Sequence, residues 1–227
     1  HVLNVNSAAL ECAGFLRSGI DHPGIPLGPD GLPTGELRGF EAMELLREIV
    51  GLKRSLLSSD EFGIRAFAKL CVRAGVTTAT DLAAPLDDFN LQTLLRITGE
   101  SSYPVRLVAL LRPASATPSE IVARAVELRG HSTEQLRLGR VKIVTDGGVP
   151  GLSCRLRWPG YYNGAPNGLW YVTPEHVRAT FELALKHGVQ VHTPANGDEA
   201  TDMALDCMAQ ALRTQTAFAN RFTIQHA

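Results

Sequence analysis

Residues 173–198, TPEHVRATFELALKHGVQVHTPANGD, contain a helix pattern followed at once by a strand pattern. Thr173 and Pro174 are typical of a helix start, apolar residues then recur at helical spacing, and Gly188 is typical of a helix end. The next stretch, Val189–Thr193, alternates apolar and polar side chains as a half-buried strand does. This part of the chain therefore predicts one helix–strand unit of a sheet that is covered by helices.

The same unit recurs along most of the chain. Strand starts are predicted near residues 76, 105, 141, 189 and 222, with a helix pattern between each pair, and Thr117–Glu120 forms a capping box. Strands that alternate with helices indicate an α/β fold with a parallel sheet. The spacing suits a (β/α)8 barrel or an open doubly wound sheet, but no glycine-rich phosphate loop follows a predicted strand. A closed barrel needs eight strands, so we expect an incomplete TIM barrel.

Residues 1–60 do not follow this pattern. The part from 20 to 38 is rich in Pro and Gly, which favours a loop over a helix or a strand. We therefore expect residues 1–60 to form an excursion that precedes the βα units of residues 61–227.

The composition excludes several classes of protein. The chain is 44% hydrophobic and 20% charged with a net charge of −1, so no basic field favours nucleic acid or an anionic membrane. No stretch approaches the ~20 apolar residues of a membrane span. The four cysteines lie far apart, which argues against a disulfide framework. We expect a cytoplasmic protein that acts on a small-molecule substrate, with a homodimer as an open alternative to a monomer.

Three side chains near predicted strand ends are candidate metal ligands. Lys142 lies in VKIVTDGG (141–148), in a strand expected to be buried on both faces, where a lysine must be paired, neutral or covalently modified. His192 and His226 belong to the next two predicted strands. Imidazole suits zinc and related metals, so the three could meet at one cation. An ion pair for Lys142 and a hydrogen-bonded core position for His192 are the structural alternatives.

Six segments, in order, resemble the amidohydrolase-3 branch of the amidohydrolase superfamily, which includes N-substituted formamide deformylase. They are HVLNVNSAAL (1–10), PDGLPTGELRGFEAMELL (29–46), GVTTATDL (75–82), VKIVTDGG (141–148), VHTPANGDEATDMALD (191–206) and FTIQHA (222–227). The resemblance implies a metal-dependent (β/α)8 barrel that hydrolyses C–N bonds other than peptide bonds, such as amide or formamide bonds, with a metal-activated water. The chain would supply about strands two to six, and we expect the other strands to lie outside it.

The resemblance also implies roles for individual residues. Lys142 matches the strand-four ligand, which is carboxylated in many members, and His226 matches the strand-six ligand; the expected cofactor is a divalent metal, zinc, as one or two ions. Strand five departs from the family, because alignment on Gly197 and Asp198 puts Pro194 where a ligand histidine is expected. Either His192 serves as ligand or catalytic residue from ~6.6 Å further back along the strand, or the metal is absent. In the second case the barrel would be non-catalytic and act in binding or regulation.

The predicted substrate contacts follow the strand that carries Lys142. Asp146 ends that strand, and Trp158 and Tyr161 lie in the long segment after it, together with Tyr162 and Trp170. Aromatic side chains there could line a pocket for an apolar or aromatic acyl group. Packing of these rings against the rim of the barrel is the alternative.

Overall fold

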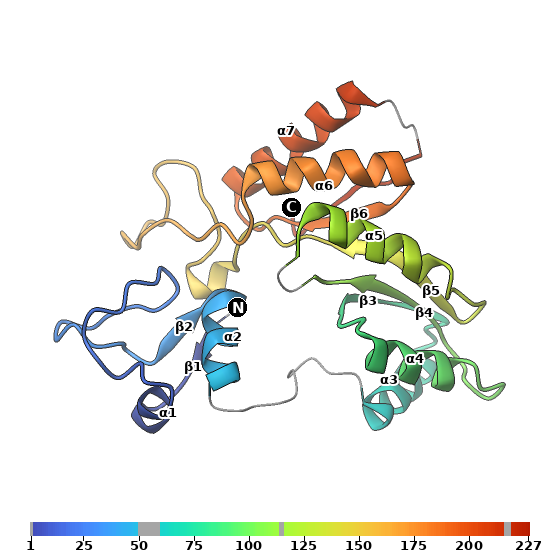
Figure 1. Cartoon of the computed structure of the whole chain (residues 1–227), viewed down its shortest axis with the longest axis horizontal. Helices are drawn as coiled ribbons and strands as arrows, with labels where there is room; N and C mark the ends of the chain where they lie inside the picture. Colours follow the sequence, from blue (N-terminus) through green and yellow to red (C-terminus); the bar gives the residue numbers. More distant parts are fainter. Residues whose placement is uncertain (1, 50–59, 114–115, 216–218) are drawn as a thin grey trace.

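The computed structural model describes residues 2–49, 60–113, 116–215 and 219–227. Within them, one parallel sheet has the strand order β3-β4-β5-β6-β7, and it curls into part of a barrel (Figure 1). The strands are Thr78–Ala84 (β3), Arg106–Leu111 (β4), Leu136–Lys142 (β5), Gln190–Pro194 (β6) and Thr223–Gln225 (β7). The α/β class and the incomplete (β/α)8 barrel predicted from the sequence are thus confirmed.

One helix precedes β3 and one helix connects each pair of neighbouring strands. These are α3 (Glu61–Arg73), α4 (Asp88–Thr98), α5 (Pro118–Arg129), α6 (Pro174–His187) and α7 (Asp198–Thr214). The N-cap side chains of four of them accept a backbone N–H from the first turn; they are Asp60, Asp87, Thr117 and Thr173. The predicted capping box at Thr117 and Glu120 is present. Local sequence therefore sets where these helices begin.

The helices pack on one face of the sheet and form its core. One buried cluster joins α3 and α4 to β3, β4 and the start of β5, and a second joins α5, α6 and α7 to β5 and β6. Phe181 of α6 is 1% exposed, and its ring centroid lies 4.7 Å from that of Phe222, just before β7. Since apolar residues of the strands face these helices, the alternate residues face the inside of the partial barrel.

An irregularity in β5 decides which of its residues share the inner face. Val108 pairs with Arg137 and Leu110 with Arg140, so β5 holds one extra residue here. Gly139, with a φ of +86°, lies in this bulge and adopts a conformation that favours glycine. The bulge brings Arg137, Arg140 and Lys142 onto the inner face, whereas Val141 packs in the helix-side core.

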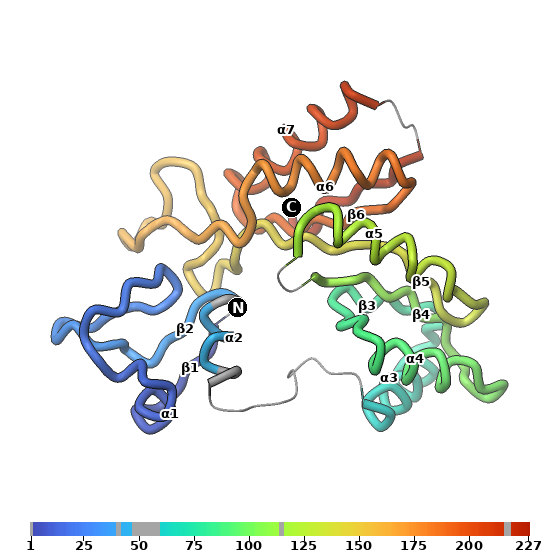
Figure 2. The backbone as a smooth tube through the Cα atoms, in the orientation of Figure 1, coloured from blue at the N-terminus to red at the C-terminus, as the bar shows by residue number. Residues whose placement is uncertain are grey.

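Residues 2–49 form a separate small layer. Strand β1 (Val2–Asn4) pairs antiparallel with β2 (Glu36–Arg38), and α1 (Ser7–Cys12) and α2 (Gly39–Ile49) complete it around its own apolar cluster. Figure 2 shows the long segment after β5, which includes the 3-10 helix η1 (Val149–Gly151), running between this layer and the βα units. Residues 50–59 lie outside the described part, so the predicted division at residue 60 stays a prediction.

Among the described residues, no helix combines the length and the apolar composition that crossing a membrane requires.

Candidate functional site

Lys142 is the last residue of β5, and it lies on the inner face beside β6. Its Cα is the register partner of the Cα of His192, so the structure brings two of the three predicted ligands onto neighbouring strands. The side chain is half-buried and lines a cavity of about 630 Å³. Burial lowers the pKa of its amine, the charge of Arg112 lowers it further, and Asp81 opposes both. The neutral amine is therefore favoured more than it is in an exposed lysine.

His192 is held by two glutamine side chains. Its Nε2 lies 3.1 Å from the Nε2 of Gln190, and its Nδ1 lies 3.0 Å from the amide of Gln225. Gln190 cannot turn its amide round, because its Oε1 accepts from Arg140 at 3.0 Å and its Nε2 donates to the carbonyl of Arg221 at 3.0 Å. Gln190 therefore donates to His192, and the Nε2 of His192 is the acceptor.

The tautomer of His192 follows from this contact. If Nε2 accepts, Nδ1 carries the proton and needs an acceptor. The buried Oε1 of Gln225 has no hydrogen-bond partner among the described residues, and it meets that need once its amide is turned over. Burial, followed by the charges of Arg140 and Lys142, lowers the pKa of His192. The ring is therefore neutral, and its one lone pair points at Gln190. To bind a metal, His192 would have to give up that contact.

His226 and Pro194 complete the predicted metal region. His226 follows β7, is exposed and has a φ of +73°. Pro194, the last residue of β6, offers no donor atom from its side chain; its carbonyl accepts from the Oγ1 of Thr145 at 2.6 Å and joins the ends of β5 and β6. The described residues contain no group of three or more His, Cys, Asp or Glu side chains that could hold a metal. Lysine is not among these residue types, so the metal-ligand roles of Lys142, His192 and His226 stay predictions.

Asp146 holds the loops that follow β5 and β6. It is 1% exposed, and its carboxylate accepts the backbone N–H groups of Arg155, Asn196 and Gly197, each at 2.9 Å. A buried carboxylate satisfied by backbone donors is a structural anchor. Asp146 is too buried to be reached in this arrangement, and the substrate contact that the sequence predicts for it stays a prediction.

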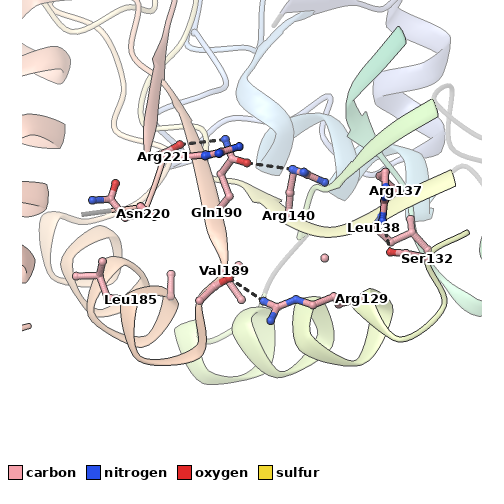
Figure 3. Close-up of a pocket in the computed structure, with 14 residues that line it drawn as sticks. Arg129, Ser132, Arg137, Leu138, Arg140, Leu185, Val189, Gln190, Asn220 and Arg221 are labelled. Atoms are coloured by element: carbon pink, nitrogen blue, oxygen red, sulfur yellow. Dashed lines mark hydrogen bonds between the residues drawn. The ribbon is translucent and has the colours of Figure 1, made fainter. Parts of the chain in front are cut away.

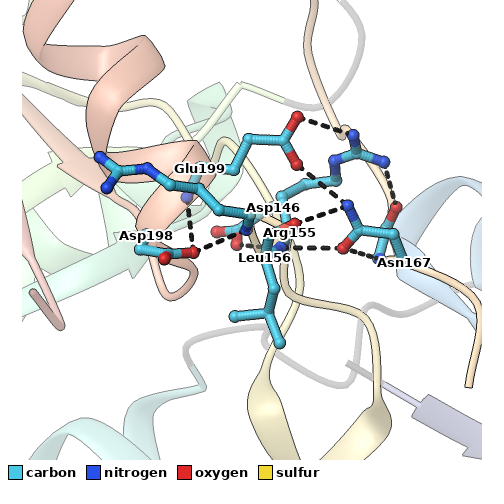
Figure 4. A network of polar contacts seen from close by, with 8 residues as sticks. Asp146, Arg155, Leu156, Asn167, Asp198 and Glu199 are labelled. Atoms are coloured by element: carbon cyan, nitrogen blue, oxygen red, sulfur yellow. Dashed lines mark hydrogen bonds and ion pairs between the residues drawn. The ribbon is translucent and has the colours of Figure 1, made fainter. Parts of the chain in front are cut away.

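A second polar network ties the long segment after β5 to the start of α7. Arg155 forms an ion pair with Glu199 at 2.9 Å and lies over the ring of Trp170, while Asn167 donates to the other oxygen of Glu199 at 3.0 Å (Figure 4). The backbone of Arg157 donates to Asp198 at 2.9 Å. Sequence reasoning did not identify this network. The acidic first turn of α7 was the one signal available for it.

The structure places the four predicted aromatic side chains in three kinds of surroundings. Trp158 and Tyr162 are 94% and 102% exposed, so their rings stand in solvent. Tyr161 packs on its own loop: its hydroxyl lies 2.9 Å from the Sγ of Cys154 and donates to the carbonyl of Cys154, and burial raises its pKa. Trp170 lines the cavity beside Lys142. The substrate contacts predicted for Trp158 and Tyr161 stay predictions.

The chain is similar to known proteins over its whole length. A family model described as "Amidohydrolase family" matches residues 1–227. The protein LONG AFTER FAR-RED 3 of Arabidopsis thaliana is 30% identical over 238 residues, which cover all of this chain and 40% of that protein. The putative amidohydrolase YtcJ of Bacillus subtilis is 26% identical over 218 residues, 92% of this chain and 39% of that protein. The chain therefore spans about 40% of the length of these curated relatives.

Two solved structures share the fold. An uncharacterised metal-dependent hydrolase from Pyrococcus furiosus superposes with a TM-score of 0.60 at 21% identity, over 93% of this chain and 42% of that one. A second, from Pyrococcus horikoshii, has a TM-score of 0.58 at 20% identity, over 92% and 40%. The match of the family model to every residue, on a partial barrel that these structures share, shows that the chain belongs to the amidohydrolase family.

Proposed function

We propose that this chain forms the central strands of a metal-dependent hydrolase that cleaves C–N bonds other than peptide bonds, such as amide or formamide bonds of a small molecule. The observation that carries the proposal is the position of Lys142 in a chain of the amidohydrolase family: at the carboxyl end of an inner barrel strand, half-buried, beside His192 and facing a cavity. Active sites of such barrels lie at this end of the strands. The names of the curated relative from Bacillus subtilis and of the two Pyrococcus structures support the same class.

The chemistry of Lys142 suits a ligand. Its lowered pKa makes the neutral amine available, and a neutral amine can add to CO2: the N–C bond forms, a proton is released, and the product is an anionic carbamate. Lys142 in that form and His226 would hold the metal, with His192 joining them only if it leaves Gln190. A divalent metal, for which we propose zinc, would polarise the scissile carbonyl and activate water.

Metal content tests this proposal. We expect one or two equivalents of metal in the full chain purified without chelator from zinc-supplemented culture, and a loss of metal in Lys142→Ala. Lys186→Ala, which removes an exposed lysine of α6, is the matched control and should keep the metal. Metal at background level in the unmodified protein would refute the hydrolase proposal.

Metal at background level would favour a non-catalytic barrel. The alternative is supported by the family resemblance, which implies a ligand histidine at the position of Pro194. It is also supported by the structure, because both ring nitrogens of His192 already face glutamine amides. Such a barrel would act by binding rather than by hydrolysis.

A further inference from the structure

A second cavity, of about 870 Å³, lies at the amino-terminal ends of β6 and β7 (Figure 3). Four arginines line it, and we call it the arginine pocket: Arg129, Arg137, Arg140 and Arg221. Gln190 and Asn220 add uncharged polar groups. No Asp or Glu belongs to its lining within the described part of the chain. The pocket is therefore strongly cationic.

The fold gathers these arginines from distant parts of the chain. Arg129 ends α5, Arg137 and Arg140 share the inner face of β5 because of the bulge at Gly139, and Arg221 lies in the turn before β7. Gly139 also allows β5 to approach α5 closely, since a Cβ there would lie 2.7 Å from the Cβ of Arg129. The pocket thus depends on the same bulge that directs Lys142 inward.

The protein neutralises little of this charge. Arg129 donates to the carbonyls of His187 and Gly188 at 3.2 and 2.9 Å, where it satisfies the carboxyl end of α6. Arg140 donates to the neutral amide of Gln190. The guanidinium groups of Arg137 and Arg221 have no hydrogen-bond or ion-pair partner among the described residues. Burial lowers the pKa of Arg140, and the charges of the other three arginines lower it further. The four positive charges therefore repel one another.

We propose that the arginine pocket binds an oxyanion with two negative charges, a phosphate group that is either free or carried by a small molecule. Planar guanidinium groups match the oxygens of phosphate with paired hydrogen bonds. A phosphate near Arg137, Arg140 and Arg221 would relieve their mutual repulsion. The volume of the pocket leaves room for an organic group attached to the phosphate.

Titration calorimetry on the full chain at constant ionic strength tests this site. Inorganic phosphate and glycerol 3-phosphate are the two probes, and tighter binding of one or the other identifies a free phosphate or an ester as the preferred form. We expect saturable binding that weakens at least tenfold, about 1.4 kcal/mol, in the double variant R137Q/R221Q. R213Q removes an exposed arginine of α7 that does not line the pocket, and should bind as the unmodified protein does.

Three results would overturn the proposal: no saturable binding, equal affinity in R137Q/R221Q and the unmodified protein, or equal competition by acetate. The test is independent of the proposed hydrolase activity, because the variants leave Lys142, His192 and His226 unchanged. Their metal content should equal that of the unmodified protein whether or not phosphate binds.

Discussion

Replacement of Asp146 by Asn should destabilise the protein strongly, although the two side chains have nearly the same shape. One carboxylate oxygen of Asp146 accepts from the backbone N–H groups of Arg155 and Gly197, and the other accepts from that of Asn196. An amide has one oxygen, so its NH2 group would face a buried N–H and neither could be satisfied. At least one charge-assisted hydrogen bond is lost and the other two become neutral ones.

The expected magnitude follows from these contacts. A hydrogen bond to a charged group contributes about 1.5–3 kcal/mol, and a neutral one contributes about 1 kcal/mol. One lost bond and two weakened bonds, together with relief from burying a charge, give a net loss of about 3 kcal/mol. Because Asp146 joins the loops after β5 and β6, those loops should be the first part of the protein to open.

Urea unfolding of the full chain and amide hydrogen exchange measure the two parts of this prediction. We expect the free energy of unfolding to fall by about 3 kcal/mol and the amides of Arg155 and Gly197 to exchange faster. Asp206→Asn, at an exposed position of α7, is the control and should change stability by less than about 0.5 kcal/mol. A change in Asp146→Asn as small as in this control, with unaltered exchange at Gly197, would refute the anchoring role.

Two further predictions concern backbone shape and pH. Gly139→Ala should cost about 3 kcal/mol in thermal or urea unfolding, because its φ is +86° and the new Cβ would meet Arg129 at 2.7 Å. Gly188→Ala, with a φ of +61° and open space around it, should cost only about 1 kcal/mol, and equal losses would contradict the close approach of β5 to α5. Burial lowers the pKa of His176 below its ordinary 6.5, so the folded state binds this proton less readily than the unfolded state and stability falls as the pH drops below 6.5. His176→Gln should therefore lose less free energy of unfolding than the unmodified protein between pH 8 and pH 5. His187→Gln, at an exposed position of the same helix, is the control and should show the same pH profile as the unmodified protein. Identical pH profiles for all three proteins would show that His176 is not the cause.

The sequence identified the candidate residues of the site, but not the contacts that hold them in the folded protein. The sequence patterns predict a strand that starts near residue 141 and ends at Asp146, whereas β5 spans Leu136–Lys142. The family resemblance implies that Lys142 is a ligand, and the structure places it at the end of its strand, in register with His192. Gln190 lies two residues from His192 on the same face of β6, which alternation along the strand allows for. The contact between Gln225 and His192 was not predictable, because it depends on the register between β6 and β7. Sequence reasoning grouped Asp146 with the substrate contacts, since an acidic residue at a strand end has the same local pattern whether it meets a ligand or backbone amides.

The sequence by itself determined the features that depend on residues close to one another along the chain. Caps such as Thr117 and Thr173, the alternation of strands and helices and the order of family segments are all local, so they can be recognised without knowing what packs against them. Only the tertiary structure decided the contacts between distant segments: the amides of residues 155, 196 and 197 around Asp146, and the arginines from 129 to 221 in one pocket. Such contacts arise when parallel strands align in register, and no short stretch of sequence encodes that alignment.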